Sequence, residues 1–409
     1  MYRFLVFLAV ACLCVPVRTS QSSKINIVES SPSVLHQSIS ESTYDAWKRL
    51  IGEAEKTIEI ACFYMTLTDG ESLPPELQAD KGIDIFNELI RANKERNVTI
   101  RVVQQKPSLY MLNKDLEYLQ KTGVASVRVL DMKKVMKGIG GILHTKFILV
   151  DGKHGYVGSA NMDWRALTQI KELGILIENC TVFANDLSKI FELYWLAAEN
   201  QTLPAVLPDS LKTNFNINNP MVLESEDREQ IRLYISSSPL PFATQGRVFD
   251  LVAVIDTIND AKEFVYFSVM DYGPQSFYTE PTFYWPAIDT ALRDAAFRNV
   301  SVHLLFSVYL HYKWETVQHW ASLNALDNVR VRSIRLPQIE ELSVPYTRVT
   351  HSKYLVTDKG GFVTTSNCAA DYYLDTGGIS VVFVGSSMVT EGLRDRFLRD
   401  WSSDWASDI

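Results

Sequence analysis

The sequence predicts an α/β protein made of two related domains, each an α/β/α sandwich, arranged as a pseudo-twofold pair. Two observations lead to this fold class. In each half, apolar stretches with the period of a strand alternate with stretches that have the period of an amphipathic helix. The second half also repeats the first at a spacing of 207 residues, at three separated places: Ser31-Pro32 with Ser238-Pro239, Ala54 with Ala261, and His144 with His351. A constant spacing of this kind indicates a tandem duplication.

The domain boundaries follow from length and composition. The 409 residues are enough for two domains with a large buried core. We expect an N-terminal domain over residues 23–205 and a C-terminal domain over 231–409. Residues 206–230 are rich in Pro and Asn and lack a long apolar period, so we interpret them as a linker. Residues 1–22 are expected to be a signal peptide, because Arg3 precedes a short apolar run that ends in Pro16 and polar residues.

The elements of each half follow from periodicity and capping. The first is a helix that Ser42 or Thr43 can cap, with Trp47 and Leu50 on its apolar face. In the first half we further expect strands at 57–65, 98–104, 126–130, 144–151 and 171–178, and helices at 82–95, 108–122 and 183–198. In the second half we expect helices at 246–260, 285–298 and 387–400 and strands at 263–270, 300–307 and 351–357. The loops 69–80 and 273–284 are candidate rims of a cleft, although plain surface loops would look the same.

The most informative stretch is residues 144–172. His144 and Lys146 are two apart in a strand-like run, so their side chains are predicted to share one face. Asp151 ends the run, and Asn161 follows ten residues later. The second half repeats the whole pattern with His351, Lys353, Asp358 and Asn367. Two full copies at equivalent places are far more specific than one copy, and they predict a functional site that both halves build.

This duplicated H-x-K-x4-D pattern resembles the signature of the phospholipase D superfamily. The chain is most similar to the animal endolysosomal branch, phospholipase D family members 3 and 4. Five stretches carry that closer resemblance: residues 158–165, 171–174, 186–191, 345–346 and 397–401. The resemblance covers nearly all of the chain after the first twenty-odd residues. It implies the superfamily's fold, with one active site between the domains, and 5′-to-3′ exonuclease activity on single-stranded DNA or RNA.

The motif residues supply what cleavage of a phosphodiester needs, namely a nucleophile, positive charge near the phosphate oxygens, and an acid for the leaving oxygen. One neutral imidazole can attack phosphorus and form a phosphohistidine. The other, protonated, can protonate the leaving oxygen and then act as a base on water or an alcohol. Lys146 and Lys353 are expected to bind the phosphate oxygens. The sequence itself does not assign the two histidine roles; the resemblance implies that His144 is the nucleophile and His351 the acid.

Further polar and aromatic residues are candidates for substrate contacts. Hydrogen bonds to the phosphate are expected from Asn161 and Asn367, with Ser159 and Ser366 as weaker candidates. Five aromatic side chains lie beside the motifs or at strand ends, where they could stack on bases. Ordinary packing is the more frequent role for such residues, which are Phe63, Tyr64, Trp164, Tyr272 and Tyr346.

Carboxylates are expected to support the histidines and the loops. Asp151 and Asp358 belong to the motif and are counted with the catalytic residues, but strand parity predicts that they face away from the phosphate and hold loops. Glu172 and its apparent counterpart Asp375 are each predicted to orient an imidazole. In the second motif Thr364 stands where the superfamily has Gly, which would be unfavourable if that backbone needed a positive φ.

Composition limits the class of substrate and cofactor. The net charge is −8 and the pI is about 5.5, which argue against a broad basic surface for duplex nucleic acid. They suit a narrow channel for one strand. No spacing of Cys, His and carboxylates is typical of a zinc or two-metal site, so we expect neither a metal nor a cofactor.

Other features place the chain in the secretory pathway. Four N-glycosylation sequons begin at Asn97, Asn179, Asn200 and Asn299. With the signal peptide they predict a glycoprotein of the lysosomal lumen or the extracellular space. Outside the signal the cysteines are Cys62, Cys180 and Cys368, an odd number that allows one internal disulfide at most.

Two other functions are consistent with the same motifs. The first is a phospholipase D or phosphatidyl transferase that acts on lipid phosphodiesters. The second is a non-catalytic secreted phosphate-binding protein, which the departures at Thr364 and Asp375 favour. The expected partner is a single-stranded nucleic acid substrate, or a phospholipid in the lipid alternative. No stable protein partner is inferred, and a homodimer is left open.

Overall fold

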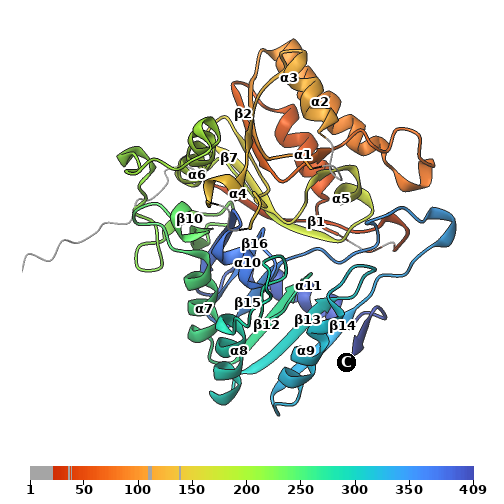
Figure 1. The fold of residues 1–409 in the computed structure, drawn as a ribbon, viewed down its shortest axis with the longest axis vertical. Helices are drawn as coiled ribbons and strands as arrows, with labels where there is room; N and C mark the ends of the chain where they lie inside the picture. Colours follow the sequence, from red (N-terminus) through yellow and green to blue (C-terminus); the bar gives the residue numbers. More distant parts are fainter. Residues whose placement is uncertain (1–21, 36, 38, 109–112, 138–139) are drawn as a thin grey trace, which may run out of the picture.

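The computed structural model describes residues 22–35, 37, 39–108, 113–137 and 140–409. The predicted signal peptide therefore lies almost wholly outside the described residues. Within them the chain forms two large mixed sheets, one in the upper and one in the lower half of the molecule (Figure 1). Helices cover both sheets, as the alternating periodicity predicts.

The first sheet has seven strands in the order β1-β9-β7-β6-β2-β4-β5. Helix α1 (Thr43–Gly52) precedes β2, and Ser42 caps it as predicted by accepting a hydrogen bond from the backbone N of Asp45 at 2.9 Å. Helix α2 (Asp80–Arg96) joins β2 to its parallel neighbour β4, and α3 (Lys114–Lys121) joins β4 to β5. Helix α6 (Thr181–Asn200) follows β9. The strand bounds are β1 Lys24–Ser30, β2 Thr57–Cys62, β4 Thr99–Gln105, β5 Ala125–Leu130, β6 Phe147–Val150, β7 His154–Gly158 and β9 Glu172–Glu178.

The second sheet repeats this order and extends it at both edges. Its nine strands run β10-β11-β17-β16-β15-β12-β13-β14-β18, so the seven from β11 to β14 match the first sheet one for one. Their bounds are β10 Met221–Glu224, β11 Gln230–Ser238, β12 Phe264–Val269, β13 Ser301–Ser307, β14 Val329–Ile334, β15 Tyr354–Thr357, β16 Gly360–Thr364, β17 Gly378–Val384 and β18 Ala406–Asp408. The helices are α7 Asp250–Asp260, α8 Ala287–Phe297, α9 Val317–Asn324, α10 Ala370–Leu374 and α11 Met388–Trp401.

One apolar core joins the two halves. It contains residues of β6 and β9 from the first sheet and of β11, β15 and β17 from the second, together with α6 and α11. Each half also has an outer core of its own, under α1 and α2 in the first half and under α7 and α8 in the second. The shared core holds the two motifs in a fixed relation.

Several predicted bounds were wrong. The motif strands do not start at the histidines, since β6 begins at Phe147 and β15 at Tyr354. The expected strand 57–65 breaks into β2 and β3 (Met65–Thr66). The expected helix 108–122 begins at Lys114, and residues 109–112 lie outside the described part. Helix α7 begins at Asp250 rather than at 246. The predicted linker contains β10, which pairs with β11; the domain boundaries themselves stay a prediction.

Candidate active site

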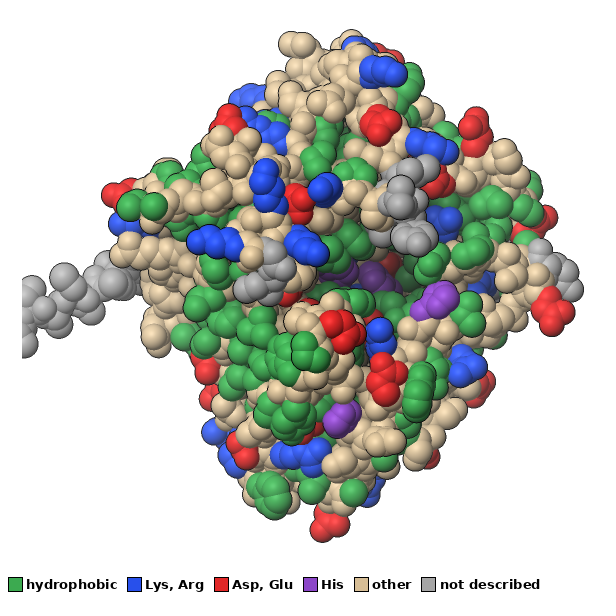
Figure 2. Space-filling view, in the orientation of Figure 1, with side chains coloured by type: hydrophobic (Ala, Val, Ile, Leu, Met, Phe, Trp, Pro, Cys, Tyr) green, Lys and Arg blue, Asp and Glu red, His purple; other side chains and the backbone are tan. Residues whose placement is uncertain are grey.

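Each motif histidine is held by the opposite half of the molecule. Just before its motif strand, the backbone leaves its own sheet and pairs across the interface. The N–H of His144 donates to the carbonyl of Gly377 at 2.8 Å, and the N–H of His351 donates to that of Lys171 at 2.7 Å. These hydrogen bonds explain why the motif strands start later than predicted. In the space-filling view, histidine side chains lie at the bottom of a hollow between the two halves (Figure 2).

The two imidazoles have different partners. Nδ1 of His144 lies 2.8 Å from the carbonyl oxygen of Thr365, and Nδ1 of His351 lies 2.8 Å from the Glu172 carboxylate. A carbonyl oxygen only accepts, so Nδ1 of His144 carries the hydrogen and, in the neutral ring, Nε2 has the lone pair. The Ser159 hydroxyl donates to Glu172 and fixes that carboxylate. One histidine therefore has an anionic partner and the other has a neutral one.

Burial and charge act in opposite directions on the two imidazoles. Burial lowers the pKa of His144 well below its usual range, and the charges of Lys146 and Lys353 lower it further. Burial also lowers the pKa of His351, but the negative charge of Glu172 opposes that shift. The proton is therefore better accommodated on His351 than on His144.

The two motif lysines are buried beside the histidines. Nζ of each donates to the carbonyl of the histidine two residues earlier, which is 2.7 Å away in the case of Lys353. Burial lowers the pKa of Lys353 to about 8. The pKa of Lys146 lies well below its usual range, because of burial first and the charge of Lys353 second. An anionic phosphodiester between them would supply the counter-charge that two buried ammonium groups need.

Glu172 has no carboxylate counterpart in the second half. Cross-interface bridges pair Leu143 with Gly377 and Lys171 with Thr350, so Glu172 corresponds in position to Gly378. A Cβ on Gly378 would lie 2.2 Å from Oγ of Ser366, which leaves no room for a side chain.

The prediction that Asp375 orients an imidazole was therefore wrong, because the Thr365 carbonyl takes that place beside His144. The Asp375 side chain contacts the Thr376 hydroxyl instead, at 3.4 Å.

The two asparagines after the motifs lie within the site. Nδ2 of Asn161 donates to the hydroxyl of Tyr64 at 3.1 Å. Nδ2 of Asn367 donates to Asp271 and to the hydroxyl of Tyr372, both at 3.0 Å. Both amide nitrogens thus already have protein partners, and phosphate binding by these residues stays a prediction.

The serines predicted beside them have other surroundings. The hydroxyl of Ser159 donates a hydrogen bond to Glu172. Ser366 lies against Gly378, and its hydroxyl has no partner among the residues that the structure describes.

Asp151 and Asp358 lie away from the phosphate site, at the far ends of the motif strands. Asp151 accepts hydrogen bonds from the backbone N–H of Glu55, Lys56 and Thr57 at 2.7–2.9 Å. Asp358 does the same for residues 262–264. The parity argument is confirmed, and grouping these two aspartates with the catalytic residues was wrong. Each ties the start of the β2 or β12 strand to the end of its motif strand.

The concern about Thr364 also proved wrong. Thr364 ends β16 and does not have a positive φ. Its counterpart Gly158 is required for a different reason, because a Cβ there would lie 2.4 Å from the hydroxyl of Tyr156. The second half has Phe362 in place of Tyr156, without a hydroxyl. The backbone geometry of the second motif is therefore intact.

Sequence reasoning missed two residues of the site. Asp271 is buried at the end of β12, where it accepts hydrogen bonds from the Tyr309 hydroxyl at 2.9 Å and from Asn367. Burial raises its pKa. The ring of Tyr372 packs edge-on against His144 at 5.2 Å between centroids. The duplication could have indicated Asp271, since it lies 207 residues after Tyr64.

The candidate stacking residues divide into buried and exposed. Trp164 and Tyr272 are buried in the protein and have the packing role. The ring of Phe63 lies 5.5 Å from that of His144, and Tyr64 binds Asn161. Tyr346 is 68% exposed, so it alone of the five has a largely free ring.

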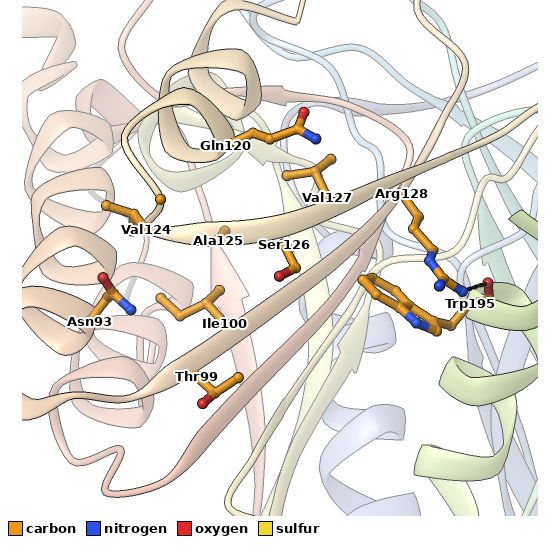
Figure 3. A pocket seen from close by; sticks show the side chains of 11 residues that line it. Asn93, Thr99, Ile100, Gln120, Val124, Ala125, Ser126, Val127, Arg128 and Trp195 are labelled. Atoms are coloured by element: carbon orange, nitrogen blue, oxygen red, sulfur yellow. Dashed lines mark hydrogen bonds between the residues drawn. The ribbon is translucent and has the colours of Figure 1, made fainter. Parts of the chain in front are cut away.

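The rest of the molecule differs from the motif site in its chemistry. Among the described residues there is no group of three potential metal ligands and no helix long and apolar enough to cross a bilayer. A hollow of about 510 Å³ lies at the outer edge of the first sheet, beside Arg128 and Trp195 (Figure 3), and none of its lining residues belongs to the motifs. Cys62, Cys180 and Cys368 are buried, and no disulfide joins any two of the cysteines in the described part of the chain. All four sequon asparagines are exposed.

The fold and the paired motifs together define a two-domain enzyme of the phospholipase D type. Two solved structures share the fold at 10% identity. Phosphatidylserine synthase of Haemophilus influenzae superposes with a TM-score of 0.62 over 94% of this chain and 87% of that one. Polyphosphate kinase of Porphyromonas gingivalis superposes with a TM-score of 0.53 over 93% of this chain and 51% of that one.

The chain belongs to the PLD3/4 family, whose PLD-like domain model matches residues 36–340. It is 40% identical to the 5'-3' exonuclease PLD3 of Xenopus laevis, over 95% of this chain and 82% of that protein. It is also 40% identical to phospholipase D Z of Dictyostelium discoideum, over 94% and 90%. The identity to human 5'-3' exonuclease PLD3 is 37%, over 90% and 76%.

Proposed function

We propose that this protein is a phosphodiesterase that removes nucleotides from the 5′ end of single-stranded DNA or RNA through a phosphohistidine intermediate. The observation that carries the chemistry is the unequal pair of imidazoles, one facing a carbonyl and one facing a buried carboxylate. The substrate and the direction of attack rest on the similarity to proteins named 5'-3' exonuclease PLD3.

The proposed roles follow from the geometry. Nε2 of His144 attacks phosphorus, and the bond from phosphorus to the leaving oxygen breaks. His351 gives its Nε2 proton to that oxygen, while Glu172 stabilises the imidazolium. A water molecule then gives a proton to His351, and its oxygen displaces His144 from phosphorus. Lys146 and Lys353 balance the charge on the phosphate oxygens throughout.

We also propose that the protein acts in the lysosomal lumen or outside the cell. The predicted signal peptide and the four exposed sequon asparagines support this location.

One experiment tests substrate and polarity together. The protein is incubated at pH about 5, because acidic pH favours the protonated form of His351, whose pKa burial lowers. The substrates are 5′-hydroxyl oligonucleotides labelled at either end and, in parallel, phosphatidylglycerol. We expect early release of the 5′ label and its loss in the His351→Ala variant. Turnover of the lipid alone would instead support the phospholipase alternative, which the name of the Dictyostelium relative favours. Equal, slow cleavage by the unaltered protein and by His351→Ala would indicate a non-catalytic phosphate-binding protein.

A further inference from the structure

Exposed aromatic side chains gather on three segments of the C-terminal half. Tyr278, Tyr284, Trp314 and Tyr346 are 58%, 66%, 70% and 68% exposed, and we call them the aromatic rim. The neighbouring Leu310 is 89% exposed. Side chains of this size are usually buried, and a group of them at one place marks a binding surface.

Two contacts join the three segments that carry the rim. Nζ of Lys313 lies 5.4 Å above the ring of Tyr278, which joins the loop after β13 to the loop 273–285. The ring of His311 lies 5.4 Å from that of Tyr346, which joins the same loop to the segment before the second motif. Tyr278 and Tyr346 are thus joined through the loop after β13, which also carries Trp314, and Tyr284 lies on the same loop as Tyr278.

The rim leads directly to the reacting histidine. Tyr278 packs edge-on against Tyr372 at 6.2 Å between centroids, and Tyr372 packs edge-on against His144 at 5.2 Å. Asp371, next to Tyr372 on α10, accepts hydrogen bonds from the backbone of Phe277 and Tyr278. The loop that carries Tyr278 is therefore fixed to the helix that contacts His144, and the predicted rim loop 273–284 lies at the mouth of the site.

We propose that the aromatic rim is the stacking platform for the bases that follow the scissile phosphate of a single strand. This inference rests on the proposed function and adds the path of the substrate to it. A polymer whose bond reaches His144 has its next units at Tyr278, where a base can stack on the ring while Lys313 faces a backbone phosphate. Glu280 and Glu315, exposed on the same loops, would repel the phosphates of a strand and an anionic lipid surface alike, so the experiment below separates these two ligands.

The test compares Tyr278→Ala and Trp314→Ala with the unaltered protein. The matched control is Phe297→Ala, an 83% exposed aromatic residue at the end of α8, on the opposite end of the sheet from the site. KM and kcat are measured on 5′-labelled oligonucleotides and on bis(4-nitrophenyl) phosphate. Loss of one stacked base should raise KM for oligonucleotides about 5- to 150-fold. The effect should grow with strand length and be smallest for the small diester.

Three comparisons complete the design. Tyr278→Phe should keep most of the affinity, because the ring remains. A strand with an abasic residue next to its 5′ nucleotide should bind the unaltered protein weakly and lose little more in Tyr278→Ala. A KM like that of Phe297→Ala in both rim variants would overturn this inference and leave the proposed function standing. So would loss of binding to phosphatidylglycerol vesicles with an unchanged KM for oligonucleotides. No digestion by the unaltered protein would overturn both proposals.

Discussion

Replacing Glu172 by Gln tests the division of labour between the two imidazoles. Gln keeps the shape of the side chain and removes the negative charge that lies 2.8 Å from Nδ1 of His351. A hydrogen bond to a buried charged group contributes about 1.5–3 kcal/mol. The protonated form of His351 should therefore become about 10- to 150-fold rarer, which corresponds to a fall of about 1–2 units in the pKa of His351.

The sign of the pH effect follows from the role of the proton. A general acid is lost as the pH rises through its pKa, so Glu172→Gln should move that loss to lower pH. At a pH above the pKa of His351 in both proteins, the rate on oligonucleotides should fall about 10- to 150-fold, and acidification should restore it in part. The first turnover of bis(4-nitrophenyl) phosphate should hardly change, because 4-nitrophenolate leaves without a proton. The assay is a pH series of both rates, with a stopped-flow record of the first turnover.

Glu178→Gln is the matched control. Glu178 lies on the same strand, is also buried, and forms an ion pair with Arg49 at 3.0 Å. The Glu178→Gln substitution should lower the melting temperature without changing the pH profile of the rate. If Glu172→Gln slowed the nitrophenyl ester as much as the oligonucleotide, or left the pH profile where it was, His351 would not be the acid and the argument from its carboxylate would be refuted.

Three further substitutions separate structural from chemical roles. Asp151→Asn should cost about 1–3 kcal/mol in unfolding free energy, because three backbone N–H groups lose a charged acceptor, and should leave kcat unchanged; thermal melts and rates on the same sample check this. Asp375→Asn should also leave kcat and its pH profile unchanged, since it does not hold His144; a loss like that of Glu172→Gln would contradict the structure. Burial raises the pKa of Asp250 to about 6, so the folded protein takes up a proton there and gains stability as the pH falls from above 6 towards 4. In Asp250→Asn the melting temperature should lose that rise, whereas Asp260→Asn, exposed at the other end of α7, should keep it.

Much of the fold was predictable, because the duplication and the periodicity can both be recognised in the sequence alone. The Ser42 cap and the apolar face of α1 follow from spacing within short windows, and the repetition of elements in the second half follows from the 207-residue spacing. The starts of β6 and β15 were not predictable in this way. They depend on hydrogen bonds from His144 and His351 to carbonyls of the other half, and no window around either motif contains those partners.

The sequence by itself determined which chemical groups the site contains. Two His-Lys pairs at one repeat spacing indicate that the site binds a phosphate group. Only the tertiary structure decided how unequal the pairs are. Glu172 and His351 are 179 positions apart, and they meet because each half completes the site of the other. At the equivalent place Gly378 lies too close to Ser366 to carry a side chain, so His144 faces a neutral carbonyl. In the repeat the two histidines look alike. Packing between segments that are far apart in the sequence makes His351 the proton donor and His144 the nucleophile.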